Sequence, residues 1–189
     1  MQLLKPGPQH IKSYLSALAR GWHDLPTGST AENVKSKIRE IQDHTSEFLD
    51  LFDDHAARAL PYLLPDKSVA YAIPSIRRWI WDETRLEYCG TVSLRWQKGS
   101  TELPPHLMGH IGYSVPPWMQ DKGFASTGLK EILKVAKVQG LPFVHIVTDI
   151  DNFASIRVIE KNNGTLIEKF TKPEMYGAGL ALRYKITTN

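Results

Sequence analysis

The stretch from His110 to Gly164 most narrowly limits the fold, because strand and helix patterns alternate along it. The strand pattern GHIGYSV ends at Pro116, and a loop of small residues then opens a helix over 123–139. The apolar run FVHIVTDI is typical of a buried parallel strand, and a second helix follows over 152–163. The strand patterns TLIEKF and GLALRYKI end the chain. This β-α-β-α-β order predicts helices packed on a sheet.

The chain before this stretch divides into a helical part and a part rich in strands. Helical spacing over 9–20 predicts a helix that ends at Gly21, and a second helical pattern runs through 38–52. Ser29 or Thr30 is placed to cap that second helix. The runs VAYAIPSI, RRWIWD and LEYCGTVSLRW then read as antiparallel strands. Together with the second half, they predict a mixed sheet of the α/β (α+β) class.

The length of 189 residues fits one domain, and no internal repeat divides it. We therefore expect a single domain over 1–189. Its helical part over 1–66 would shape the acceptor site, and 67–189 would form the sheet and the ligand-binding core.

The composition argues against disulfides, metal sites, membrane spans and a signal peptide. Cys89 is the only cysteine, so no intramolecular disulfide or cysteine-rich zinc cluster can form. His106 and His110 would not share a helical face, and we expect no metal site. No apolar run is long enough to span a membrane, and Pro6 and Pro8 interrupt any signal-peptide pattern. A cytoplasmic location is therefore expected.

The formal charge of +3 and the pI near 8.9 favour an anionic ligand. Lysine and arginine are scattered and form no basic stripe, so a nucleic-acid partner is not expected.

The loop QDKGFA, from Gln120 to Ala125, is suited to holding a phosphate group. The first turn of the following helix leaves backbone N–H groups without intrahelical partners, and its dipole favours an anion. Gly123 allows close approach of a ligand, and Lys122 could add a point charge. The alternative is that Gly123 merely starts a helix. The loop matches neither a P-loop nor a dinucleotide fingerprint.

Two motifs in order resemble the GNAT superfamily of acetyl-CoA-dependent N-acetyltransferases. QDKGFA is similar to the superfamily's [RQ]xxGx[GA] diphosphate loop. The run over 152–161 is similar to its N-x-x-S-x-R-V-x-E-K helix, a form common in ribosomal-protein N-terminal acetyltransferases. The stretch over 77–118 also looks like a group of predicted bacterial acetyltransferases. This resemblance covers 68–187 and is firmest over 86–170.

The resemblance implies the GNAT fold, with a mixed central sheet of about seven strands flanked by helices. It implies that the strands over 110–115 and 143–149 splay apart, so that the pantetheine arm of acetyl-CoA enters between them. Backbone groups of 113–115 would pair with that arm, and an N–H near Val115 would polarise the thioester carbonyl. Amides of 120–125 would hold the diphosphate.

The resemblance therefore implies acetyl-CoA as co-substrate and a defined set of binding residues. Asn152 would bind the pantetheine arm, and Ser155 would lie near the sulfur. The full set is Tyr113, Ser114, Val115, Gln120, Asp121, Lys122, Gly123, Phe124, Ala125, Asn152 and Ser155.

The implied reaction is direct attack of an amine on the thioester, which needs a proton acceptor and a proton donor. His110 and Asp149 are candidate bases, although a buried structural histidine and a helix-capping aspartate are the alternatives. Ile159 stands where many members carry a tyrosine that protonates the leaving thiolate. Ser155 or Tyr176 would replace it, or the thiolate would leave unassisted.

Several points stay open at the level of sequence. The acceptor would be a small amine or a peptide N-terminus, chosen by the N-terminal helices and the loop over 97–109. Glu102 in that loop could select a cationic amine or could simply be solvated. A non-catalytic acyl-CoA-binding module with the same fold is the main alternative to an enzyme. Many members of the superfamily dimerise, so a homodimer is an option by analogy.

Overall fold

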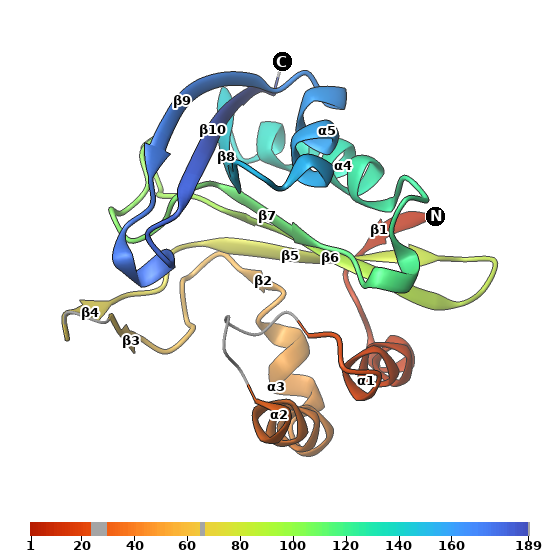
Figure 1. The fold of residues 1–189 in the computed structure, drawn as a ribbon. Coiled ribbons are helices and arrows are strands. Elements are labelled where there is room, and N and C mark those ends of the chain that lie inside the picture. The colour runs from red at the N-terminus through yellow and green to blue at the C-terminus, as the bar shows by residue number, and fades with distance from the viewer. Residues whose placement is uncertain (24–29, 65–66, 189) are drawn as a thin grey trace.

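The protein is built on two antiparallel sheets flanked by five helices, as a computed structural model of residues 1–23, 30–64 and 67–188 shows (Figure 1). The helices are α1 (Ile11–Ala19), α2 (Ala31–Asp43), α3 (Thr45–Asp50), α4 (Phe124–Val138) and α5 (Phe153–Lys161). Short 3-10 turns lie at Pro8–His10, Pro117–Met119 and Glu174–Tyr176. The strands are β1 (Gln2–Leu4), β2 (Asp53–Asp54), β3 (Tyr62–Leu63), β4 (Val69–Ala70), β5 (Ser75–Asp82), β6 (Glu87–Arg95), β7 (Ile111–Ser114), β8 (Phe143–Asp149), β9 (Thr165–Thr171) and β10 (Leu180–Thr187).

The larger sheet has the order β1-β5-β6-β7, and β2 pairs with another part of β5. The smaller sheet has the order β8-β10-β9, and β3 and β4 form a separate two-stranded ribbon. β7 and β8 are each the terminal strand of their sheet. They face each other where the two sheets meet. This boundary positions the candidate site.

Helices cover both faces of the larger sheet. In Figure 1, α4 and α5 lie above it, whereas α1, α2 and α3 lie below. The upper core packs Leu94 and Ile132 against the smaller sheet. The lower core is aromatic and includes Phe52, Trp79 and Tyr88, all of which are fully buried. Burying large apolar side chains on both faces stabilises the sheet from both sides.

The predicted fold class is confirmed, and the helices over 123–139 and 152–163 appear as α4 and α5. Thr30 caps α2 by accepting a hydrogen bond from the Asn33 N–H, whereas Ser29 lies outside the described residues. The expected mixed sheet of about seven strands is found as two antiparallel sheets, because β7 and β8 form no ladder among the described residues. None of the described helices is both long and apolar enough to cross a membrane.

Two strand predictions need correction. The run VAYAIPSI is not one strand, because Pro74 cannot donate to a ladder and β5 begins only at Ser75. The edge strand β1 lies in the part of the chain expected to be helical, and it pairs with Trp79–Trp81 of β5.

Candidate functional site

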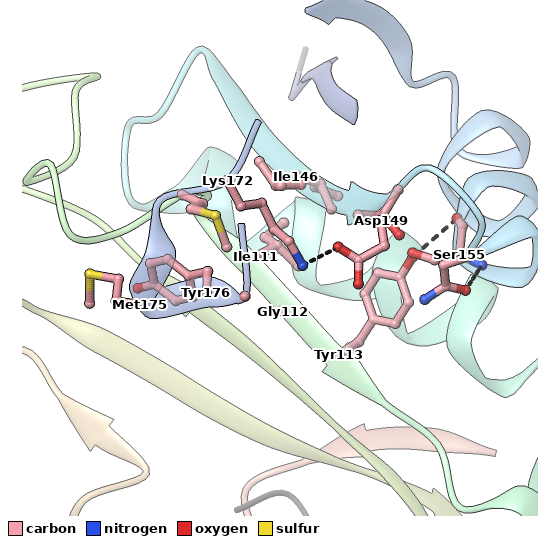
Figure 2. Close-up of a pocket in the computed structure, with 14 residues that line it drawn as sticks. Ile111, Gly112, Tyr113, Ile146, Asp149, Ser155, Lys172, Met175 and Tyr176 are labelled. Carbon is pink, nitrogen blue, oxygen red and sulfur yellow. Dashed lines mark hydrogen bonds and ion pairs between the residues drawn. The ribbon is translucent and has the colours of Figure 1, made fainter. Parts of the chain in front are cut away.

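β7 and β8 meet at one point and then separate. The His110 N–H donates to the His145 carbonyl oxygen over 2.8 Å, just before β7 begins. Gly109 makes this approach possible, because a Cβ there would lie 3.0 Å from the His145 oxygen. Figure 2 shows Gly112 and Tyr113 on one side of the resulting opening, with Ile146 and Asp149 on the other. The splay expected for these two strands is therefore present.

A cavity of about 740 Å³ occupies this opening. Its walls are the two separating strands, the start of α5 and the segment between β9 and β10. The lining residues are Met108, 111–113, 146–149, Asn152, Ser155, Lys172 and 175–177. Three of the four candidate catalytic residues, Asp149, Ser155 and Tyr176, thus share one cavity (Figure 2).

A second cavity of about 500 Å³ lies between the end of β7, the start of α4 and one side of α5. It is lined by 113–115, 119–121, 123–126, Asn152, 154–155, 157–158 and Lys161. All of the predicted cofactor-binding residues except Lys122 line this cavity. The Lys122 ammonium instead donates to the Trp118 carbonyl oxygen over 2.8 Å.

The loop before α4 has the geometry of an anion site. Gly123 is the N-cap of α4 with a φ of +79°, and no atom lies within 4 Å of the position a Cβ would take. The first turn of α4 carries no acidic residue, so nothing in it opposes an anion. Asp121, the only acidic residue of the loop, has a φ of +59° and is solvent-exposed. Backbone N–H groups before Thr127 therefore face a cavity that is open to a ligand.

Tyr113 and Ser155 join β7 to α5 where the two cavities meet. Their side-chain oxygens lie 2.7 Å apart, and the Tyr113 hydroxyl also donates to the Ser155 carbonyl oxygen over 3.3 Å (Figure 2). Both residues, together with Asn152, line both cavities. Asn152 fixes the start of α5, because its side-chain oxygen accepts from the Ser155 N–H. Burial raises the pKa of Tyr113 to about 12, so its hydroxyl stays protonated.

Asp149 ends β8 and forms an ion pair with Lys172 from the other side of the larger cavity (Figure 2). The Asp149 side chain is half-exposed, whereas the Lys172 side chain is mostly buried. The Tyr176 hydroxyl donates to the His106 carbonyl oxygen, which holds the segment between β9 and β10 against the loop over 97–109.

His110 lies beside the cavity but does not line it. Its side chain is 1% exposed, and Nδ1 accepts a hydrogen bond from the His145 N–H over 3.0 Å. Burial, together with the neighbouring His145, lowers the pKa of His110 to about 4. These contacts favour the alternative stated for it, a buried structural histidine.

Ile159 is fully buried in the upper core. Its side chain packs over Gly164, where a Cβ would come within 2.3 Å of it. Ile159 therefore faces the core, and its side chain lines neither cavity. Glu102 is exposed and lines neither cavity.

Sequence analysis missed two cations of the smaller cavity, Arg157 and Lys161. They are four residues apart on α5, so they share one helical face. Their spacing could have indicated in the sequence that both face the same ligand. The same helical face also carries Val158 and, one turn earlier, Ala154, and both line the cavity.

Comparison of the chain with known proteins identifies a family. A family model described as an acetyltransferase (GNAT) domain matches residues 27–165. No curated protein sequence matches the chain.

Solved structures share the fold at low sequence identity. RimL, a ribosomal-protein alpha-N-acetyltransferase in complex with coenzyme A, is 16% identical with a TM-score of 0.62, over 98% of this chain and 92% of that one. MccE, a microcin self-immunity acetyltransferase in complex with acetyl-CoA and AMP, is 13% identical with a TM-score of 0.61, over 98% and 91%. A variant of the spermidine N-acetyltransferase from Vibrio cholerae is 14% identical with a TM-score of 0.55, over 99% and 94%.

Proposed function

Because the chain belongs to the acetyltransferase (GNAT) family, we propose that it transfers the acetyl group of acetyl-CoA to a primary amine. The amine belongs to a small molecule or to a peptide N-terminus, and it attacks the thioester directly. Two similar structures are named for amine acceptors, a ribosomal-protein alpha-amine and spermidine, which supports an amine here as well.

One observation carries the proposal: the opening between β7 and β8 connects two cavities of different character. The smaller cavity lies at the N-terminus of α4, and the larger one contains the candidate proton-transfer groups. Tyr113, Asn152 and Ser155 line both. A thioester placed at these three residues would have its nucleotide end in one cavity and its acceptor in the other.

The smaller cavity fits coenzyme A. The N–H groups at the start of α4 are available to the diphosphate, and Gly123 leaves room for it. Arg157 and Lys161 add two positive charges on the facing side of the cavity. The pantetheine arm would pair with the exposed edge of β7, as an added strand does.

Most of the rate would come from positioning the amine against the thioester. A backbone N–H near Val115, at the end of β7, would donate to the thioester oxygen as negative charge develops on it. The fixed β-structure around Ser114, which pairs with Thr91 of β6, holds that segment in place.

We assign proton acceptance to Asp149, directly or through one water. It lines the larger cavity, whereas His110 is buried behind β7. Lys172 forms an ion pair with the Asp149 carboxylate across the cavity and fixes its position there. A charged carboxylate also attracts the ammonium form of the acceptor before its proton is removed.

We assign proton donation to Ser155, with Tyr113 behind it. The Ser155 hydroxyl would protonate the leaving thiolate while the Tyr113 hydroxyl passes its proton to Ser155 across their hydrogen bond, and water would return a proton to Tyr113 after product release. This pair supplies the function that Ile159, inside the core, does not.

The proposal is tested by measuring free thiol release from acetyl-CoA with amino acids, polyamines and short peptides, alongside calorimetry with coenzyme A. We expect binding of coenzyme A and turnover with at least one amine. Binding without turnover across the panel would favour the non-catalytic acyl-CoA-binding module. A lack of binding would refute the site itself.

A further inference from the structure

A second group of charged residues lies beside the larger cavity and takes no part in the mechanism above. Arg95 is the last residue of β6, and its Nη2 lies 3.2 Å from the position a Cβ would take on Gly112. Gly112 lines the larger cavity, and the Ser93 hydroxyl lies on the same side, 3.5 Å from that position. Arg95 itself lines neither cavity, but the missing side chain at Gly112 leaves its guanidinium directly behind a residue that does.

Arg95 is a partly buried cation without an anionic partner among the described residues. Within the described part of the chain, its guanidinium makes no hydrogen bond and no ion pair. Burial lowers the pKa of Arg95, and the groups that act on its charge are Tyr176, Tyr62 and Arg77. No carboxylate is among them. The guanidinium is always charged, so an oxyanion that reaches it would gain a charge-assisted contact that the protein itself does not supply.

Arg77 adds a second positive charge on the same side of the sheet. It pairs with Ser93 across β5 and β6, and its charge opposes that of Arg95. Arg77 is exposed, so it adds positive potential on this side of the sheet, which favours an oxyanion.

The two carboxylates of β2, which pairs with the start of β5, already have partners. Asp53 of β2 pairs with Arg78 over 2.6 Å and with Lys5 over 3.0 Å. The Asp54 carboxylate accepts from the backbone N–H groups of Arg58 and Ala59. Neither is free to neutralise Arg95.

We propose that the acceptor amine carries an oxyanion, a carboxylate or a phosphate, which binds Arg95 beside Gly112 while the amine faces Asp149. This inference rests on the proposed function and specifies its substrate class. Arg95 binds the oxyanion through its guanidinium fork, and Arg77 strengthens the local positive potential. The acceptor is therefore anionic or zwitterionic, and a polyamine is a poor substrate.

The test compares acceptors that differ only in the anion. 3-Aminopropanoate is paired with 3-aminopropanamide for the carboxylate, and phosphoethanolamine is paired with ethanolamine for the phosphate. Spermidine serves as the cationic acceptor. We expect kcat/KM for one anionic member to exceed that of its neutral partner by about ten- to a hundredfold, as for a charge-assisted hydrogen bond. The pair that shows the preference identifies the oxyanion.

Variants of Arg95 assign that preference. Arg95→Gln removes the charge and should abolish the preference, whereas Arg95→Lys keeps the charge and should retain part of it. Arg85→Gln is the matched control, because Arg85 is exposed in the turn between β5 and β6. The control should keep the full preference. An unchanged coenzyme A affinity and melting temperature show that each variant is folded.

A binding readout separates this inference from the proposed function. Each acceptor is titrated by calorimetry into the protein saturated with coenzyme A, where no acetyl group is present. Tighter binding of an anionic acceptor that Arg95→Gln removes supports the inference, even when no acetyl-CoA is consumed. Equal binding of the charged and neutral members of both pairs, or a preference for spermidine, overturns it.

Discussion

The hydrogen bond between Tyr113 and Ser155 ties β7 to α5 at the point where the thioester would react. Tyr113 was expected from the sequence only as a source of backbone contacts. Its side chain instead lines both cavities, and its hydroxyl is within 2.7 Å of the Ser155 oxygen. Two groups thus share the role of proton donor in the proposed mechanism, and each is open to a separate test.

Tyr113→Phe and Ser155→Ala should both lower kcat while leaving coenzyme A binding nearly unchanged. We expect a loss of about tenfold to a hundredfold for Ser155→Ala, at or below the lower end of the range for acid–base groups, because a thiolate leaves readily. The loss for Tyr113→Phe should be smaller and should not add to that of Ser155→Ala. Stopped-flow thiol release measures the rates of both variants and of the double variant. Fully additive losses would contradict a shared proton path.

His110→Asn tests the titration of a buried histidine. The pKa of His110 is lowered from its ordinary 6.5 to about 4, so the unfolded chain takes up a proton first as the pH falls. Folding stability is therefore present above pH 6.5 and is lost as the pH falls from 6.5 to about 4, by up to about 3 kcal/mol. Urea unfolding followed by tryptophan fluorescence should show a flatter acid dependence in the variant.

The asparagine side chain introduced by His110→Asn can still accept from the His145 N–H, so the fold should persist. His145, whose pKa burial also lowers, contributes in the same direction and leaves a residual acid dependence. Turnover of the variant near that of the wild type is expected if Asp149 is the base. A loss of kcat above about a hundredfold would return that role to His110.

At the scale of the elements, α4 and α5 supply opposite sides of the smaller cavity. The α4 side was predictable, because Gly123 and the small residues around it mark a helix that opens on a ligand. The charges of α5 were not predicted to bind a ligand, although Arg157 and Lys161 are positions of the motif over 152–161, because the sequence does not show that their shared face meets the cavity.

Replacing Arg157 and Lys161 together by glutamine should weaken coenzyme A binding by about tenfold, because two charge-assisted contacts to phosphate are lost. Affinity for pantetheine, which has no phosphate, should not change. Lys130→Gln, on the exposed side of α4, is the control. Calorimetry at low and high salt should show that the wild-type advantage shrinks as salt rises. Equal affinities of variant and wild type would remove these residues from the site.

The elements that the sequence did not predict are short or interrupted. β1 has three residues, too few to show the alternation that identifies a strand, and it exists because β5 offers an edge. The break before β5 comes from Pro74, whose effect on a ladder outweighs the β-propensity of its neighbours. Long periodic segments such as α4, by contrast, were located to within about one residue at each end.

For the molecule as a whole, the two cores on opposite faces of the larger sheet support different parts of the candidate site. The upper core supports α4, α5 and the cofactor cavity, whereas the aromatic lower core supports the face from which Arg77 and Arg95 emerge. Phe52 belongs to this lower core, and its carbonyl oxygen accepts from the Arg77 N–H over 2.8 Å. If the acceptor binds Arg95 as proposed, stability and acceptor binding would be linked on one side of the sheet.

Phe52→Ala should lower the free energy of unfolding by about 3–5 kcal/mol, the cost of a large cavity in a core. The Phe52 side chain is fully buried and packs edge-on to Phe48 and Trp79. At temperatures where the variant is folded, its KM for the acceptor should rise and its affinity for coenzyme A should not change. Denaturant titrations and steady-state kinetics give these quantities. Ile132→Ala, in the upper core, should instead weaken coenzyme A binding and leave the KM for the acceptor unchanged. If both variants change the same quantity, the two cores do not support separate sites.

The backbone hydrogen bond that joins the two sheets has a consequence for handling the protein. Beyond His110 and His145, the facing edges of β7 and β8 have no ladder between them among the described residues. Exposed strand edges are where foreign chains add on and where amyloid-like growth begins. The pantetheine arm would cover both edges. Coenzyme A would then protect the protein from aggregation. Preparations without bound coenzyme A would aggregate sooner on storage than preparations that retain it.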